Sequence, residues 1–461
     1  MKNSIRRIFW VLATCLFLLL YYLGTLLLVQ REAIASNPYN PRLRYENPLL
    51  RRGDILDCNG IVLAESVLDE NGLYVRQYPM AELAVHITGY SSRGKTNIEA
   101  YKNFEMMTLD NEISQRIGQI FGDEVLQGNH ISLTIDYELQ KLAGELLDDA
   151  KGSIVVMEPS TGKVLALQSY PSFNPNTLNE DWTDLNADED SPFLNRATQG
   201  LYPPGSTFKI ITALSIMRNV KNWQDITYNC QGVAYFQDKI IHCYDGAEHG
   251  EVGLHEAVTH SCNTYFAHMA VNELSAEVLA ETMIDSGIHA EYEFSTAKSK
   301  NQTSLSANST ESELVETSIG QGKTALTPLY MAMLLSGIAN DGIMMQPYLV
   351  DHVENDNGEE TKHSVPKKAM EIATAEETTI LKEMLQSVVD SGTGVQSQIS
   401  GLAVAGKTGT AQNATENDHS WFIAMAPVEA PEVVVCVMIE NRDRDGSAVP
   451  IAKQMLIAAE K

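Results

Sequence analysis

Hydrophobic positions form one long uninterrupted run near the N-terminus, followed by many short runs. Residues 8–29 hold no charged residue and are numerous enough to cross a bilayer as a helix. Basic residues lie among residues 1–7, so the positive-inside rule predicts a cytoplasmic tail there and export of the rest of the chain. Ala33-Ile34-Ala35 resembles a signal-peptidase site. Because the apolar run exceeds the ~7–15 residues of a signal-peptide core, its length favours a permanent single-pass anchor.

The segment after this run is predicted to be a stalk and a small domain. Residues 36–41 contain two prolines and two asparagines, a composition that cannot form a helix. Between residues 51 and 128, short apolar runs are interrupted by turn sequences such as Asp57-Cys58-Asn59-Gly60. We therefore assign residues 30–130 to a stalk and a partly β N-terminal pedestal.

A different pattern, with longer elements, occupies residues 131–461. Residues 153–157 and 164–168 are strand-like and joined by a turn, which predicts a hairpin. Further strands are expected between residues 404 and 439, and a long helix over Ala375–Asp390. Strands at both ends of a mainly helical region predict one α+β domain.

One segment within this domain lacks a regular hydrophobic pattern. Residues 179–190 are acidic and weakly apolar, and we expect a solvated loop there. At the end of the chain, residues 447–459 predict a closing helix.

The charge of the chain limits its partners. Its 33 basic and 60 acidic residues give a formal net charge of −27. Such a surface repels phosphate backbones, so we expect no nucleic-acid partner. The acidity itself is interpreted as a source of solubility.

Six cysteines in an exported chain raise the question of disulfides. Cys15 lies in the apolar run and Cys436 in a strand-like run, so both are interpreted as packing residues. Cys230 and Cys243 flank a hairpin-like stretch and form the only plausible pair, although spacing alone leaves their bonding open. Cys262 has no evident basic partner and is also interpreted as a packing residue.

Candidate chemistry begins at Tyr202-Pro203-Pro204-Gly205. These residues end any preceding element, and an apolar helical run follows, which places Ser206 in the first turn. Lys209 is three residues further, on the same face. A desolvated lysine amine can accept the proton of a nearby serine and so activate it as a nucleophile. Taken alone, the pair could equally be a helix cap with a snorkelling lysine.

A second short motif is Ser261-Cys262-Asn263. It offers a hydroxyl and an amide two residues apart, which could relay a proton toward a leaving group and hold a substrate amide. By itself the tripeptide carries little weight, because Ser and Asn populate turns anyway.

The third motif is Lys407-Thr408-Gly409-Thr410. A glycine in a strand lets a substrate backbone approach, and Lys407 and Thr408 could engage a carboxylate. The backbone N–H of Thr410 could pair with that of Ser206 as an oxyanion hole. In this order, S-x-x-K, S-x-N and K-T-G are the signatures of penicillin-interacting serine acyltransferases.

We expect no metal and no cofactor. The segment His255-Glu256-Ala257-Val258-Thr259-His260 superficially suggests zinc. The zinc motif needs histidines at i and i+4 on one helix face, and here the spacing is i, i+5.

Across nearly its whole length the chain resembles a class B penicillin-binding protein, a monofunctional peptidoglycan D,D-transpeptidase. The opening segment of the pedestal is recognisable at residues 52–60, with Cys58 where an arginine is usual. A second pedestal segment spans residues 94–99, with Asn97 in place of a glycine. Four segments of the transpeptidase domain recur, at residues 133–136, 195–197, 318–322 and 405–412.

The resemblance implies a fold and a role for each motif. The fold is a penicillin-binding transpeptidase domain, related to the serine β-lactamases, with a five-stranded antiparallel sheet flanked by helices. The implied roles are acylated nucleophile for Ser206, general base for Lys209, proton transfer and substrate placement for Ser261 and Asn263, and binding of a terminal or β-lactam carboxylate for Lys407 and Thr408.

The implied activity removes the terminal D-Ala of a peptidoglycan stem peptide and joins the acyl group to the amine of a neighbouring stem, with inhibition by β-lactams. Alternatives are a D,D-carboxypeptidase, a β-lactamase or a non-catalytic penicillin-binding scaffold. No E-x-x-L-N-like deacylating segment is evident. Residues 37–42 resemble the stalk of transpeptidases that work with an FtsW/RodA-type glycosyltransferase, which makes such a membrane protein a candidate partner.

Overall fold

The computed structural model describes residues 2–28, 50–107, 127–148, 150–412, 417–441 and 448–460. The predicted stalk at 36–41 lies outside these residues. Helix α1 (Lys2–Leu28) contains the expected apolar run, and its segment Ile5–Leu26 is long and apolar enough to cross a membrane.

The N-terminal domain is built on a six-stranded sheet with the order β13-β12-β4-β1-β2-β3. β1 pairs antiparallel with β2 and parallel with β4, which joins it to the later strands β12 and β13. A partly β pedestal is therefore present. The chain returns to its sheet at β12, which begins at residue 350. The predicted domain boundary at residues 130–131 stays a prediction. The strands are β1 (Ile55–Leu56), β2 (Val62–Leu68), β3 (Tyr74–Gln77), β4 (His130–Leu133), β12 (Val350–Glu354) and β13 (Glu360–His363).

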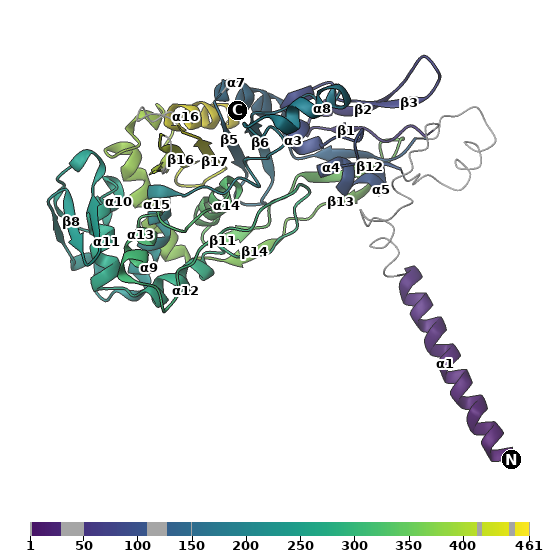
Figure 1. The fold of residues 1–461 in the computed structure, drawn as a ribbon, viewed down its shortest axis with the longest axis horizontal. Coiled ribbons are helices and arrows are strands. Elements are labelled where there is room, and N and C mark those ends of the chain that lie inside the picture. Colours follow the sequence, from purple (N-terminus) through teal and green to yellow (C-terminus); the bar gives the residue numbers. More distant parts are fainter. Residues whose placement is uncertain are drawn as a thin grey trace.

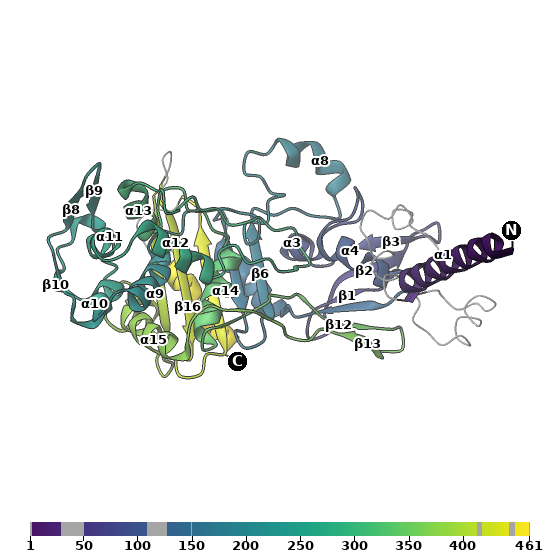
Figure 2. The ribbon, with the colours of Figure 1, turned by 90° about the horizontal axis from the view of Figure 1, so that it is seen from below.

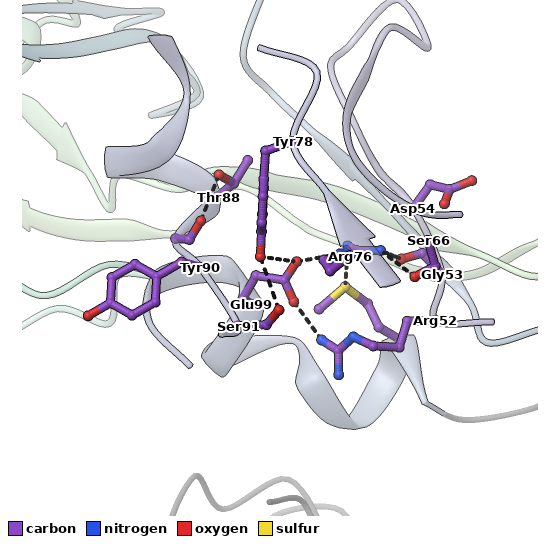
Figure 3. A network of polar contacts seen from close by, with 12 residues as sticks. Arg52, Gly53, Asp54, Ser66, Arg76, Tyr78, Thr88, Tyr90, Ser91 and Glu99 are labelled. Carbon is purple, nitrogen blue, oxygen red and sulfur yellow. Dashed lines mark hydrogen bonds and ion pairs between the residues drawn. The ribbon is translucent and has the colours of Figure 1, made fainter. Parts of the chain in front are cut away.

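A buried carboxylate connects the segments of this domain (Figure 3). Glu99, on α4 (Asn97–Tyr101), accepts hydrogen bonds from Nη2 of Arg52 and Nε of Arg76, each at 2.6 Å. Tyr78 Oη donates to the same carboxylate at 3.4 Å. Burial alone would raise the pKa of Glu99, but the two guanidinium groups outweigh it and hold the pKa below its ordinary value. The carboxylate thus remains charged and joins α4 to β3 and to the start of the domain. Two further short helices, α3 (Val85–Thr88) and α5 (Asn103–Met106), pack nearby.

The second domain has a five-stranded antiparallel sheet with the order β15-β16-β17-β5-β6, as predicted from the resemblance. Every residue of β5 and β17 is buried because helices cover both faces of the sheet (Figure 1). Ile154 and Val156 pack with α7 and α16, whereas Val155 and Met157 belong to the cluster that contains α14. The strands are β5 (Gly152–Met157), β6 (Val164–Tyr170), β15 (Ala405–Ala411), β16 (His419–Ala426) and β17 (Val433–Ile439).

The region between these strands is mainly helical, as the sequence predicts. Helix α15 spans Ala375–Asp390, the range predicted, because Thr374 and Glu377 form a capping box at its start. Further helices of this domain are α7 (Tyr137–Leu147), α9 (Lys209–Asn219), α10 (Leu254–Thr259), α11 (Asn263–Asn272), α12 (Ala276–Asp285), α13 (Glu311–Ser318), α14 (Pro328–Ala339) and α16 (Ala448–Ala459).

Three two-stranded ribbons complete this region. Figure 2 shows two of them, β7–β10 and β8–β9, at the end of the molecule remote from the six-stranded sheet. The ribbon strands are β7 (Tyr228–Cys230), β8 (Val233–Phe236), β9 (Lys239–His242), β10 (Gly250–Val252), β11 (Ile343–Met345) and β14 (Lys368–Glu371).

The expectation of a loop over residues 179–190 is wrong. Most of that segment forms helix α8 (Leu178–Ala187). Leu178 is buried against an aromatic cluster that Trp182 and Leu185 also contact, so the helix has a sparse apolar face at i, i+4 and i+7. Two acidic residues in its first turn stabilise the helix, because negative charge interacts favourably with the N-terminal end of the helix dipole. The acidity of this segment is compatible with a helix and does not indicate a loop.

Candidate active site

Ser206 lies in a tight turn at the start of a buried helix, as the sequence predicts. Gly205–Phe208 form a 3-10 turn that continues directly into α9. Gly205 adopts a positive φ of 54° and donates its backbone N–H to the carbonyl of Gly320 at 2.9 Å. The turn fixes Ser206 one turn before Lys209, with the intervening Thr207 and Phe208 buried.

The amine of Lys209 is the centre of the polar contacts. Its Nζ lies 3.0 Å from Oγ of Ser206, 3.1 Å from Oγ of Ser261, 2.7 Å from the Ser261 carbonyl oxygen and 2.5 Å from Oδ1 of Asn263. The residue is fully buried, and burial lowers its pKa from 10.5 to about 8. With this pKa, about a tenth of the molecules hold Lys209 as a neutral amine, able to accept a proton, at pH 7.

The second motif reaches Lys209 from the turn between α10 and α11. Ser261 takes a positive φ of 57°, so its carbonyl and its hydroxyl both face the amine. Asn263 begins α11, and its Nδ2 donates to the carbonyl of His242 at 2.8 Å. With Oδ1 on Lys209 and Nδ2 on His242, the orientation of the Asn263 amide is fixed from both ends.

The third motif lies on β15, the edge strand of the central sheet. Glycines allow this strand to press against the turn that holds Ser206. A Cβ atom at Gly409 would lie 2.9 Å from the Pro204 carbonyl oxygen, and one at Gly205 would lie 2.4 Å from the Thr410 carbonyl oxygen. Thr410 is exposed. The two residues predicted to form an oxyanion hole, Ser206 and Thr410, are thus brought to neighbouring backbone segments.

Lys407 and Thr408, which are consecutive on β15, have different environments. Lys407 is fully buried, and burial together with the charge of Lys209 places its pKa well below the ordinary value of 10.5. Its Nζ donates to the Thr408 carbonyl at 3.4 Å. The hydroxyl of Thr408 lies 2.6 Å from that of Thr393, a residue that none of the three sequence motifs includes. The Ser391-Gly392-Thr393-Gly394 turn after α15 is the one signal that could have drawn attention to it.

The predicted pair Cys230 and Cys243 meets at the far side of this site. Their sulfur atoms are 3.6 Å apart and unbonded, and both thiols are buried. Cys262 joins them, with its sulfur 3.8 Å from that of Cys243. The two histidines dismissed as zinc ligands have separate contacts: His255 lies against Ser387 of α15, and the ring of His260 stacks on that of His249.

Comparison with known proteins decides the family. A family model described as the penicillin binding protein transpeptidase domain matches residues 152–456, and one described as the penicillin binding protein A dimerisation domain matches residues 52–131. The chain belongs to the penicillin-binding protein transpeptidase family. The family expected from the motifs is therefore confirmed.

Individual relatives of this penicillin-binding protein cover 89–100% of its length. The peptidoglycan D,D-transpeptidase PbpA of Mycobacterium tuberculosis is 30% identical over 493 aligned residues, which cover 100% of this chain and 99% of the relative. The solved imipenem acyl-enzyme complex of penicillin-binding protein A from M. tuberculosis has a TM-score of 0.81 at 28% identity, covering 90% of this chain and 99% of that one. A D,D-transpeptidase domain of a peptidoglycan glycosyltransferase from Eggerthella lenta also has a TM-score of 0.81, at 33% identity, covering 89% and 98%. The expected fold is confirmed by these likenesses.

Proposed function

We propose that this penicillin-binding protein is a peptidoglycan D,D-transpeptidase that works through an acyl-Ser206 intermediate and is inhibited by β-lactams. One observation carries the proposal: a single buried amine, Lys209 Nζ, contacts the hydroxyls of Ser206 and Ser261 and the amide of Asn263. The names of its relatives, which include D,D-transpeptidases and β-lactam acyl-enzymes, support the same chemistry.

In the first step the neutral amine of Lys209 takes the proton of Ser206. Oγ then attacks the carbonyl carbon of the penultimate D-Ala of a stem peptide, and the carbonyl electrons move to oxygen. The backbone N–H groups of Ser206 and Thr410 stabilise this oxyanion, and the packing of Gly205 against Thr410 supports that pairing.

Collapse of the intermediate breaks the C–N bond and releases D-Ala. The departing amine needs a proton, and Ser261 can pass one from the ammonium of Lys209, since its hydroxyl lies 3.1 Å from Nζ. The amine of a second stem peptide then attacks the Ser206 ester and gives up a proton along the same route. The products are a new peptide bond and the free hydroxyl of Ser206.

Substrate placement falls to β15 and its neighbours. An extended peptide can pair with an edge strand through backbone hydrogen bonds. Lys407 and Thr408 within that strand, with Thr393 beside Thr408, can hold the terminal carboxylate of the substrate. A bound carboxylate would favour the charged form of the buried amine of Lys407, because an opposite charge offsets burial.

The N-terminal helix and the pedestal define where this reaction takes place. Helix α1 would be a single-pass anchor, with residues 1–7 in the cytoplasm and the domains from residue 30 onward outside the cell membrane. An FtsW/RodA-type glycosyltransferase that makes the glycan strands is the proposed membrane partner. Co-purification of the full-length protein with such a polymerase, compared with a form lacking the stalk residues 36–41, tests this assignment.

Intact mass spectrometry after mixing the full-length protein with a penicillin tests the chemistry. We expect one stable adduct on the wild-type protein and none on Ser206→Ala. Unmodified protein with hydrolysed drug would instead identify a β-lactamase. Unmodified protein with intact drug would leave a non-catalytic scaffold as the better description.

A further inference from the structure

A cluster of metal-binding side chains lies behind the S-x-N motif, outside the chemistry derived above. Cys230 ends β7, Cys243 follows β9, His249 precedes β10, and Cys262 caps α11. Their ligand atoms, three Sγ and one imidazole nitrogen, all lie within 4.8 Å of one another. Residues from four separate segments therefore converge on one point.

Three of the six separations between these atoms are close to the edges of a coordination tetrahedron, and the other three are no longer than 4.8 Å. With Zn–S bonds of about 2.3 Å and Zn–N bonds of about 2.0–2.1 Å, tetrahedral zinc requires S···S separations of about 3.8 Å and S···N separations of about 3.5 Å. The observed separations are 3.6 Å for Cys230–Cys243, 3.8 Å for Cys243–Cys262 and 3.3 Å for Cys230 Sγ to His249 Nδ1. A metal ion fits with only small adjustments of these side chains.

We propose that Cys230, Cys243, Cys262 and His249 bind one zinc ion. On binding, the three thiols release their protons to solvent and coordinate as thiolates, while His249 coordinates as neutral imidazole through Nδ1. Four protein ligands make a closed site of the structural type, with no position left for water or substrate.

The surroundings of the cluster suit thiolate ligands. All three cysteines are buried, so their negative charge needs compensation. Thr264 is buried as well, and its hydroxyl donates to Cys230 Sγ at 3.1 Å while lying 3.4 Å from Cys262 Sγ and 3.6 Å from Cys243 Sγ. The backbone N–H of Tyr265 donates to Cys262 Sγ at 3.4 Å. These donors form the outer hydrogen-bond shell that orients the ligands of a metal site.

A disulfide explains the cluster less completely. A Cys230–Cys243 bond would use two of the three thiols. Cys262 would stay unbonded, at about its present distance from the Cys243 sulfur. It would also give no reason for an imidazole nitrogen to face the Cys230 sulfur at 3.3 Å. Zinc uses all four groups.

The site would hold part of the proposed catalytic machinery in place. Cys262 lies between Ser261 and Asn263, both of which contact Lys209. Cys243 follows His242, whose carbonyl accepts the amide hydrogen of Asn263. Zinc would therefore tie the two ribbons to the start of α11 and position Ser261 and Asn263 against the amine. The positioning role rests on the proposed function, whereas the metal site itself does not.

Metal analysis of the full-length protein, purified in detergent without chelators, tests the site directly. We expect one zinc per chain in the wild type, and none in the double variant Cys230→Ser/Cys243→Ser. Cys436→Ser, which removes a buried cysteine on β17, is the matched control and should retain the metal. Because the double variant could fail to fold, cobalt(II) is also added to chelator-treated wild type, where thiolate-to-cobalt charge-transfer absorption is expected.

The positioning role is measured on the same samples. Removal of zinc should lower the rate of penicillin acylation about tenfold or more, and added zinc should restore it. Metal-free wild type with all its thiols reactive and no cobalt spectrum would overturn the proposal. So would a native Cys230–Cys243 disulfide, detected as a missing pair of thiols. Bound zinc with unchanged acylation after its removal would retain the site and overturn its positioning role.

Discussion

The Nζ atom of Lys209 lies 3.0 Å from Oγ of Ser206, one turn away, and the lysine is completely buried. A fully buried lysine that contacts no carboxylate among the described residues is unusual in a protein core, because burial disfavours its charged form. Here the same burial makes the amine a base. The burial that disfavours charged Lys209 therefore also enables its amine to activate Ser206.

Acylation should depend on pH through Lys209. The residue accepts a proton only when neutral, and its pKa is lowered to about 8. The rate constant for acylation by a fluorescent penicillin should therefore rise about tenfold per pH unit below that value and level off above it. Lys209→Arg should be inactive throughout, because a guanidinium does not deprotonate. A flat profile in the wild type would argue against this role.

Asn263→Ala should impair acylation far more than stability. The change removes the oxygen that contacts Lys209 and the donor to the exposed carbonyl of His242, which water can satisfy. We expect acylation to fall about ten- to hundredfold, the equivalent of one hydrogen bond to a charged or reacting group. Asn272→Ala, an exposed site on the same helix that bonds only within it, is the control and should leave acylation unchanged. Equal effects of the two substitutions would refute the assignment.

Comparison of Gly205→Ala with Gly401→Ala should distinguish the effect of close packing on acylation from that of backbone strain. A Cβ atom there would lie 2.4 Å from the Thr410 carbonyl, so β15 must move away from Ser206. A displacement of this size can cost about a hundredfold in rate. Gly401→Ala has the same kind of positive φ but no atom within 4 Å of the new Cβ. Both variants should lower the melting temperature, Gly205→Ala by more because its clash adds to the backbone strain. Only Gly205→Ala should slow acylation; slow acylation in both would contradict this explanation.

Local sequence signals were sufficient for much of this fold and for the members of the site. The Thr374–Glu377 capping box marks the start of α15. The Pro203-Pro204-Gly205 sequence marks the turn at Ser206, because it ends the preceding element and tolerates a positive φ. Each signal involves residues only a few positions apart, so it can be recognised without knowledge of the tertiary structure.

Features that depend on long-range packing could not be predicted in this way. Thr393 reaches Thr408 only because the turn after α15 folds onto β15. The sequence suggested Cys230 and Cys243 as neighbours because they flank a hairpin-like stretch, but it gave no reason to add His249 and Cys262. Their meeting depends on how two ribbons pack against α11, a relationship that spacing along the chain does not encode.

The buried carboxylate of the pedestal supplies the last prediction. Glu99→Gln leaves the guanidinium groups of Arg52 and Arg76 buried without their counter-charge, which should lower stability by about 3–5 kcal/mol. The check is the melting temperature of the full-length protein, with Glu291→Gln as the control because its ion pair with Lys300 is solvent-exposed and should matter little. Since the pKa of Glu99 lies below its ordinary value of 4.5, the contribution is complete above that pH and is lost as the pH falls through the lowered pKa. An unchanged melting temperature in Glu99→Gln would show that the two arginines find other partners, and that this carboxylate does not hold the pedestal together.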